Sequence, residues 1–208
     1  ENHYTITATA GANGVVDPSG ATDMIEGESL TIEIEAEDGY TVKTITVDGT
    51  ELSSGERANH LTGYAFENIE DDHTIEVTFA TDENGNNIPD DEEYFTITSS
   101  VVPDASGDNN GSINPSGETS VQYGHDQSYT FAADTGYTVK AITVDGTTVS
   151  SGDREEYRVN GYTFSYVSGD HTITVEYATD RNGNNIPDDE ENHYTITATA
   201  GANGVVDP

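Results

Sequence analysis

The chain has 208 residues, of which 40 are acidic and only 6 are basic, so its formal net charge is −34 at pH 7. This charge excludes nucleic acids and anionic membrane surfaces as partners and leaves cations as the natural counter-charges. The absence of cysteine excludes a disulfide framework and any thiolate metal site. No apolar run approaches transmembrane length, so we expect no membrane insertion in this segment.

The sequence repeats itself on two scales. Residues 1–18 and 191–208 are identical at an offset of 190. Within that period, GYTVKTITVDGT at 39–50 returns as GYTVKAITVDGT at 136–147. The offset of this inner repeat grows from 91 to 98, mostly through extra residues around Val102–Asn110. Because insertions are tolerated on surfaces, we place these residues in a loop.

Apolar and polar residues alternate with a period of two along both copies, which is typical of strands. The alternating runs lie at 4–10, 30–36, 45–48, 64–66 and 75–79 in the first copy, and at 95–97, 129–131, 142–144, 162–164 and 173–177 in the second. Turn sequences such as GANG, DPSG and VDGT separate them, and no helical stripe interrupts them. We therefore predict an all-β fold: two small antiparallel β-sandwich-like domains of five to six strands each, in a linear tandem array. A β-grasp-like repeat domain is the alternative.

Each copy ends in a segment with the spacing of a twelve-residue calcium loop, in which oxygen ligands fall at positions 1, 3, 5, 7, 9 and 12. The predicted metal ligands are Asp82, Asn84, Asn86, the Ile88 carbonyl, Asp90 and Glu93 in the first loop, and Asp180, Asn182, Asn184, the Ile186 carbonyl, Asp188 and Glu191 in the second. Position 6 is Asn87 or Asn185 instead of the usual glycine, and Asn tolerates the left-handed backbone needed there. Two copies in register argue against the alternative, a flexible acidic linker with accidental spacing.

Three motifs of the first copy carry a family resemblance: HYTITATAGANGVVDPSG, GYTVKTITVDG and GYAFENIEDDHTIEVTFA. With them, the copies resemble divergent internalin-type B-repeats of bacterial surface proteins. Where many of those repeats have Trp after Gly-Tyr-x, this chain has Val42 and Val139 nearby. The predicted loops, flanked by strands, resemble the calcium loops of bacterial thrombospondin type 3 repeats. The resemblance implies a small β domain used in tandem on cell surfaces, and it implies no ligand.

The predicted organisation follows from the repeats and the loops. It comprises β repeat domain A (1–81), a calcium-binding linker (82–93), β repeat domain B (94–179), a second calcium-binding linker (180–191), and the first strand and turn of a further A repeat (192–208). Because that last segment carries nothing to complete its domain, we expect the chain to continue in both directions as a long fibre. A filament of separate subunits that exchange a strand is the alternative.

Other candidate residues carry less chemistry. Lys43 and Lys140 occupy equivalent sites, and we expect their aliphatic stems to cover a sheet edge while their amines reach water. An intramolecular isopeptide bond between a lysine and an asparagine is a weaker alternative. His73 and His171 also match, each opening the last strand of its copy, and are interpreted as hydrogen-bonding or packing residues. No Ser-His-acid set recurs and no phosphate-cradling loop exists, so we expect no enzyme.

The predicted function is that of a structural tandem-repeat segment in an extracellular surface stalk or secreted filament, rigidified by Ca²⁺ at its linkers. Its expected partners are neighbouring repeats of the same chain, and lateral self-association is left open. One alternative is an adhesin module that binds a glycan or a host protein through its loops, with Tyr123 and Tyr157 as candidate exposed aromatics. Another is a spacer within a large secreted enzyme.

Overall fold

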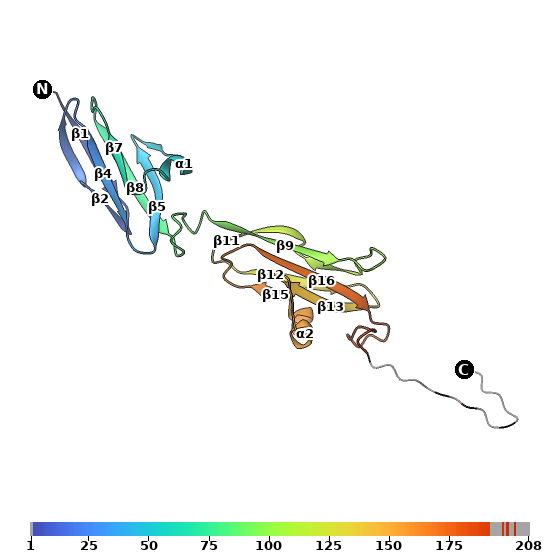
Figure 1. Ribbon diagram of the computed structural model, residues 1–208. Coiled ribbons are helices and arrows are strands. Elements are labelled where there is room, and N and C mark those ends of the chain that lie inside the picture. The colour runs from blue at the N-terminus through green and yellow to red at the C-terminus, as the bar shows by residue number, and fades with distance from the viewer. Residues whose placement is uncertain (1, 192–196, 198, 200–201, 203–208) are drawn as a thin grey trace. The chain divides into compact units, whose positions relative to one another are not determined.

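The computed structural model describes residues 2–191 together with 197, 199 and 202, so the strand and turn predicted at 192–208 lie outside the described residues. Its contacts form two compact units. The first comprises Glu1–Phe95 with Val121–His125 and Tyr166–Ser168, and the second comprises the rest of the chain. Each sheet takes its strands from only one copy of the repeat (Figure 1).

The first copy forms a five-stranded sheet in the order β3-β1-β8-β5-β6 and a three-stranded sheet in the order β2-β4-β7. Helix α1 (Ser54–Arg57) lies beside β5. The strands are β1 (His3–Ala10), β2 (Gly14–Asp17), β3 (Gly20–Ile25), β4 (Leu30–Ala36), β5 (Tyr40–Val47), β6 (Thr50–Glu51), β7 (Gly63–Phe66) and β8 (His73–Thr81).

The second copy repeats this plan, with sheets in the orders β11-β9-β16-β13-β14 and β10-β12-β15. Helix α2 (Ser151–Asn160) packs against β12 and β13. The strands are β9 (Tyr94–Val102), β10 (Gly111–Asn114), β11 (Gly117–Gln122), β12 (Gln127–Ala133), β13 (Tyr137–Val144), β14 (Thr147–Thr148), β15 (Tyr162–Phe164) and β16 (His171–Thr179).

One apolar core joins the two sheets of the first copy. Ile6, Ile45 and Ile75 enter it from the five-stranded sheet, and Ile32 and Phe66 enter it from the three-stranded sheet. Along β4, buried Ile32 and Ile34 alternate with exposed Thr31 and Glu33, which is the pattern of a sheet with one face on a core and one in water. The predicted all-β, sandwich-like fold is therefore confirmed, and this arrangement favours the sandwich over the β-grasp alternative.

The sheets are mostly antiparallel, as predicted, but each copy also contains one parallel pairing. Strand β1 pairs in parallel with β8, and β9 pairs in parallel with β16. These are the first and last strands of each copy, so no hairpin constrains their relative direction, and alternation of apolar residues is the same in either direction. The predicted strand count was also too low, since each copy has eight strands, one of which is only two residues long.

Each copy also contains a helix, although the sequence shows no helical stripe. The repeated SSGER and SSGDR sequences are helix starts: Ser53 and Ser150 are N-caps whose hydroxyls accept hydrogen bonds from the amides of Glu56 and Asp153. Helix α1 has only four residues, too few to show a period, and most of the ten residues of α2 are polar.

Two turn predictions are confirmed. Asp48 and Gly49 have φ of 49° and 77°, as a type I′ turn requires at both central positions of the hairpin between β5 and β6. The extra residues of the second copy form the loop between β9 and β10. Its Asp104 carboxylate accepts hydrogen bonds from the amides of Ser106 and Asp108, at 2.8 and 3.0 Å, which closes the loop.

Candidate metal centre

The first predicted calcium loop begins where strand β8 ends. Asp82 is buried, 5% exposed, and its amide donates to the Gly39 carbonyl at 2.9 Å. The amide of Asp90 returns to the Thr81 carbonyl, also at 2.9 Å. Between these two anchors, Pro89 is buried against the domain. The loop is therefore folded back onto the end of β8 and belongs to the first compact unit.

Inside the loop, side-chain oxygens accept hydrogen bonds from backbone amides. The two carboxylate oxygens of Asp82 accept from Asn86 and Asn87, at 3.0 and 2.8 Å. The side-chain oxygen of Asn84 accepts from the Asn86 amide at 3.0 Å, and that of Asn86 accepts from Ile88 at 2.8 Å. These bonds wind the backbone into successive Asx turns. Asn87 has φ of 66°, the left-handed conformation expected at position 6.

Three of the predicted ligand side chains converge. The amide nitrogens of Asn84 and Asn86 each donate to the Glu93 carboxylate at 2.8 Å, which brings positions 3, 5 and 12 together. Asp90 is held separately, since its carboxylate accepts the Glu83 amide at 3.2 Å. The structure thus groups Asn84, Asn86 and Glu93, while the carboxylates of Asp82 and Asp90 are bound to loop amides.

The second loop has the same architecture. Asp180 is 5% exposed and accepts from the amides of Asn184 and Asn185, at 3.1 and 2.8 Å. Asn182 and Asn184 both donate to Glu191, at 2.7 and 2.5 Å. Asn185 has φ of 64°, and Ile186 donates to the Asn184 side chain at 2.8 Å. Asp188 accepts the Arg181 amide at 3.1 Å, as Asp90 accepts that of Glu83.

The donor set of each loop fits calcium in its chemistry. All six predicted donors are oxygens, from carboxylates, amides and one backbone carbonyl, which are the hard ligands that Ca²⁺ takes. Within the described part of the chain, no three His, Cys, Asp or Glu side chains form a group that could hold a metal ion. The Asn amide nitrogens face Glu93 and Glu191, so ligation by the Asn oxygens would replace these hydrogen bonds.

Sequence reasoning missed the residues that dock each loop. Arg57 in helix α1 binds the Glu92 carboxylate through both terminal nitrogens, at 3.2 and 2.7 Å. Lys43 binds Asp91 at 2.8 Å and Glu92 at 2.7 Å. The hydrogen bonds from Arg57, reinforced by Lys43 and opposed by partial burial, lower the pKa of Glu92 to about 2. Glu92 therefore stays ionised in all but strongly acidic solution.

The same contacts recur in the second copy. Arg154 binds Glu190 through both terminal nitrogens, at 2.7 and 2.9 Å, and Lys140 binds Asp189 at 2.9 Å. The interpretation of the two lysines as stems with their heads in water was incomplete, because both amines bind loop carboxylates. The partners of the two amines are Asp and Glu side chains, whereas the isopeptide alternative would join each lysine to an Asn. One signal could have revealed the docking: four of the six basic residues recur at equivalent positions.

The matched histidines are hydrogen-bonding and packing residues, as predicted. His73 Nδ1 lies 2.8 Å from an Asp48 carboxylate oxygen, and its ring stacks on Phe66 with centroids 5.0 Å apart. His171 repeats both contacts with Asp145 and Phe164, at 2.8 and 4.7 Å. Each pair fastens the hairpin turn of its copy to the start of the last strand.

The candidate exposed aromatics are corrected by the structure. Tyr123 is half-buried beside Phe95 and Tyr166, and Tyr157 is half-buried against Tyr162 with ring centroids 5.0 Å apart. Among the described residues, the exposed tyrosines are instead Tyr94 and Tyr166, at 58% and 50% exposed.

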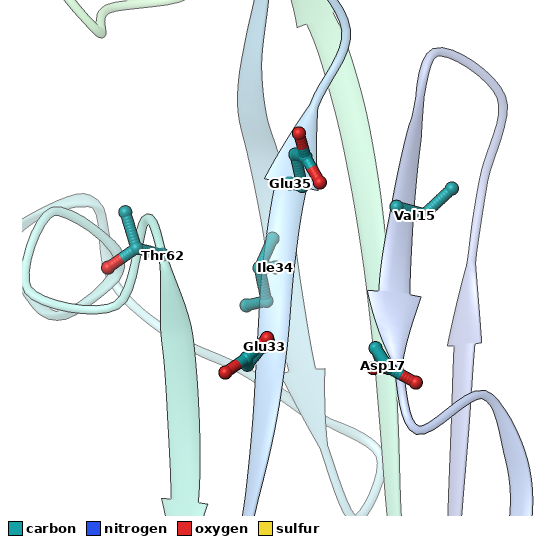
Figure 2. A pocket seen from close by; sticks show the side chains of 6 residues that line it. All are labelled: Val15, Asp17, Glu33, Ile34, Glu35 and Thr62. Atoms are coloured by element: carbon teal, nitrogen blue, oxygen red, sulfur yellow. The ribbon is translucent and has the colours of Figure 1, made fainter.

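An open hollow lies on the outer face of the β2–β4–β7 sheet (Figure 2). Asp17 on β2 is paired directly opposite Glu33 on β4, and exposed Val15 is opposite Glu35. In the second copy the positions of the three acids are taken by Asn114, Thr130 and Ala132. The acidic character of this hollow is therefore not shared by the equivalent face of the second copy, whereas the predicted calcium loop occurs in both.

No protein-family model and no curated protein matches this chain. In the described residues, no helix is both long and apolar enough to cross a membrane.

Proposed function

We propose that this chain is a structural segment of an extracellular tandem-repeat stalk or filament, and that its two loops bind Ca²⁺. One observation carries the proposal: the same six-ligand spacing folds twice into the same arrangement, with the side chains at positions 3, 5 and 12 in contact. The resemblance to B-repeats of bacterial surface proteins and to thrombospondin type 3 calcium loops supports a cell-surface setting.

The negative charge of the loops favours the binding of a cation. The first loop has six carboxylates among its twelve residues. Like charges at such spacing repel by about 1 kcal/mol per close pair even in water. Ca²⁺ accepts six to eight oxygens in a flexible shell, whereas Mg²⁺ demands a small octahedron and retains its waters. Calcium would reduce the negative charge of the loop and restrict the freedom of the chain between consecutive domains, which is the property that a stalk needs.

Calorimetric titration of the chelator-treated protein tests the proposal. We expect two calcium sites per chain, with Mg²⁺ binding much more weakly. The Glu93→Gln and Glu191→Gln variants should each abolish one site, because position 12 supplies a bidentate carboxylate. Small-angle scattering with and without chelator should then show a larger maximum dimension in calcium. A protein that releases no heat with calcium and keeps one maximum dimension would refute the proposal.

The adhesive alternative has one supporting observation, the two exposed tyrosines Tyr94 and Tyr166. Aromatic faces in solvent are suited to stacking on sugars or on a partner protein. Glycan-array binding that is lost in the Tyr94→Ala variant would favour this second function. An array without signal would leave only the structural function.

A further inference from the structure

Most of the basic residues of this acidic protein lie on the domains and contact the two loops. Of the six in the sequence, Lys43, Arg57, Lys140 and Arg154 form two equivalent pairs. All four bind carboxylates at loop positions 10 and 11, which are not predicted calcium ligands. The loops therefore use some of their acids to hold the preceding domain and the others to form the cation site.

The arginines are fixed on the domain side. Arg57 and Arg154 are only 9% and 8% exposed. Each sits in a capped helix and also donates to a backbone carbonyl, that of Lys43 at 2.5 Å or that of Lys140 at 2.6 Å. Lys43 and Lys140 lie at β-bulges in β5 and β13. Their carbonyls therefore take no part in the hydrogen bonds between strands. A planar guanidinium held by three acceptors has little freedom left, so its partner carboxylate is fixed as well.

The partner carboxylate is adjacent in sequence to the last ligand of the loop. Glu92 precedes Glu93 and Glu190 precedes Glu191, at position 12. Fixing the residue at position 11 limits the backbone positions available to position 12, whose carboxylate already meets the Asn side chains of positions 3 and 5. Residues that orient a metal ligand commonly change metal affinity by about 10- to 100-fold.

We propose that the Arg57–Glu92 and Arg154–Glu190 pairs are positioning residues for calcium, and that through them metal binding is coupled to the folded state of the domain that precedes each loop. This inference rests on the proposed function, because it requires the loops to bind Ca²⁺. By thermodynamic reciprocity, a domain that preorganises its loop is stabilised in turn when the loop binds the ion.

The test removes one pair without changing the net charge. In a Glu191→Gln parent, which reports the first loop alone, the double variant Arg57→Gln/Glu92→Gln deletes the contact. We expect its calcium affinity, measured by competition with a chelator, to fall about 10-fold. The rise in melting temperature on adding calcium should shrink with it. The matched control is Arg158→Gln/Glu155→Gln, which removes an ion pair of 3.1 Å inside helix α2 and should leave the affinity of the first loop unchanged.

The outcomes separate a positioning role from a merely structural one. A double variant that melts earlier without calcium but keeps the parental affinity overturns the proposal. If the double variant does not fold, the Arg57→Lys variant is measured instead, because it keeps the charge but loses the bidentate contact with Glu92. A calcium affinity that is a few-fold lower than that of the parent supports the proposal. An unchanged affinity overturns it. If the parent itself binds no calcium, the proposed function fails first, and this inference fails with it.

Discussion

At the residue scale, the two copies place different side chains at one core position. Tyr129 on β12 is fully buried, and its hydroxyl has no hydrogen-bond partner among the described residues. The equivalent residue of the first copy is the apolar Ile32, which is also fully buried. A buried polar group without a partner retains the cost of leaving water, which is about 1–3 kcal/mol.

This difference predicts that Tyr129→Phe stabilises the second copy. The substitution keeps the ring, which packs edge-on against Phe164 with centroids 6.0 Å apart, and removes only the unpaired hydroxyl. We expect the free energy of unfolding in urea to rise by about 1 kcal/mol. Tyr177→Phe is the control, because that hydroxyl donates to the Ser112 carbonyl at 2.5 Å and its loss should destabilise by a similar amount. A Tyr129→Phe variant that is less stable would contradict this account.

The turns of the two loops could be predicted from the sequence, and the residues that dock the loops could not. Hydrogen bonds among Asp82, Asn84 and Asn86 act over a few residues, so their spacing alone indicates the turns. Arg57 meets Glu92 across 35 residues, and only the bulge and the capped helix bring them together. No local sequence pattern indicates that contact.

At the element scale, alternation of apolar residues predicted most strands but not their partners. A period of two places Ile6 and Ile75 on a buried face whichever way their strands run, so the parallel pairing of β1 with β8 could not be read from it. Helix α2 was missed for the opposite reason: its N-cap Ser150 is a local signal, but no apolar stripe follows it to indicate a helix.

The two loops also differ as elements, at position 2. The first has Glu83 and the second has Arg181, so the first carries a formal charge of −6 and the second −4. Arg181 is 83% exposed and lies 3.6 Å from the predicted ligand Asp188. Its charge opposes an incoming cation, although solvent screens most of the effect.

We therefore predict that Arg181→Glu raises the calcium affinity of the second loop about two- to five-fold at low ionic strength, equivalent to roughly 0.4–1 kcal/mol, the range of exposed ion pairs. The gain should disappear near 1 M salt, where screening acts within about 3 Å. Arg158→Glu makes the same change of charge in helix α2 and serves as the control. Titration of a Glu93→Gln parent isolates the second loop. A gain that persists in high salt would show that Arg181 acts through something other than its charge.

At the scale of the whole molecule, each copy of the repeat forms the same sandwich and is followed by its own loop. Each sheet closes within one copy, and the parallel register of Ile6 with His73 returns as Ile97 with His171. Repeat proteins of this kind have a stability close to the sum of the stabilities of their units. Calcium at a hundred times its dissociation constant would add about 2.7 kcal/mol to each unit that holds it.

This architecture predicts that core damage stays within one copy. Ile45 on β5 and Ile142 on β13 are equivalent residues and fully buried. Truncation of either to Ala should cost about 2–5 kcal/mol through lost burial and the cavity left behind. Hydrogen exchange should show lost amide protection in β1, β5 and β8 for Ile45→Ala, with β9, β13 and β16 unchanged, and the reverse for Ile142→Ala. Because the two variants are each other's control, protection lost in both copies from a single substitution would mean that the copies fold as one cooperative unit. In that case calcium at one loop would stabilise the whole chain, and the coupling proposed for Arg57 and Arg154 would extend beyond the domain before each loop.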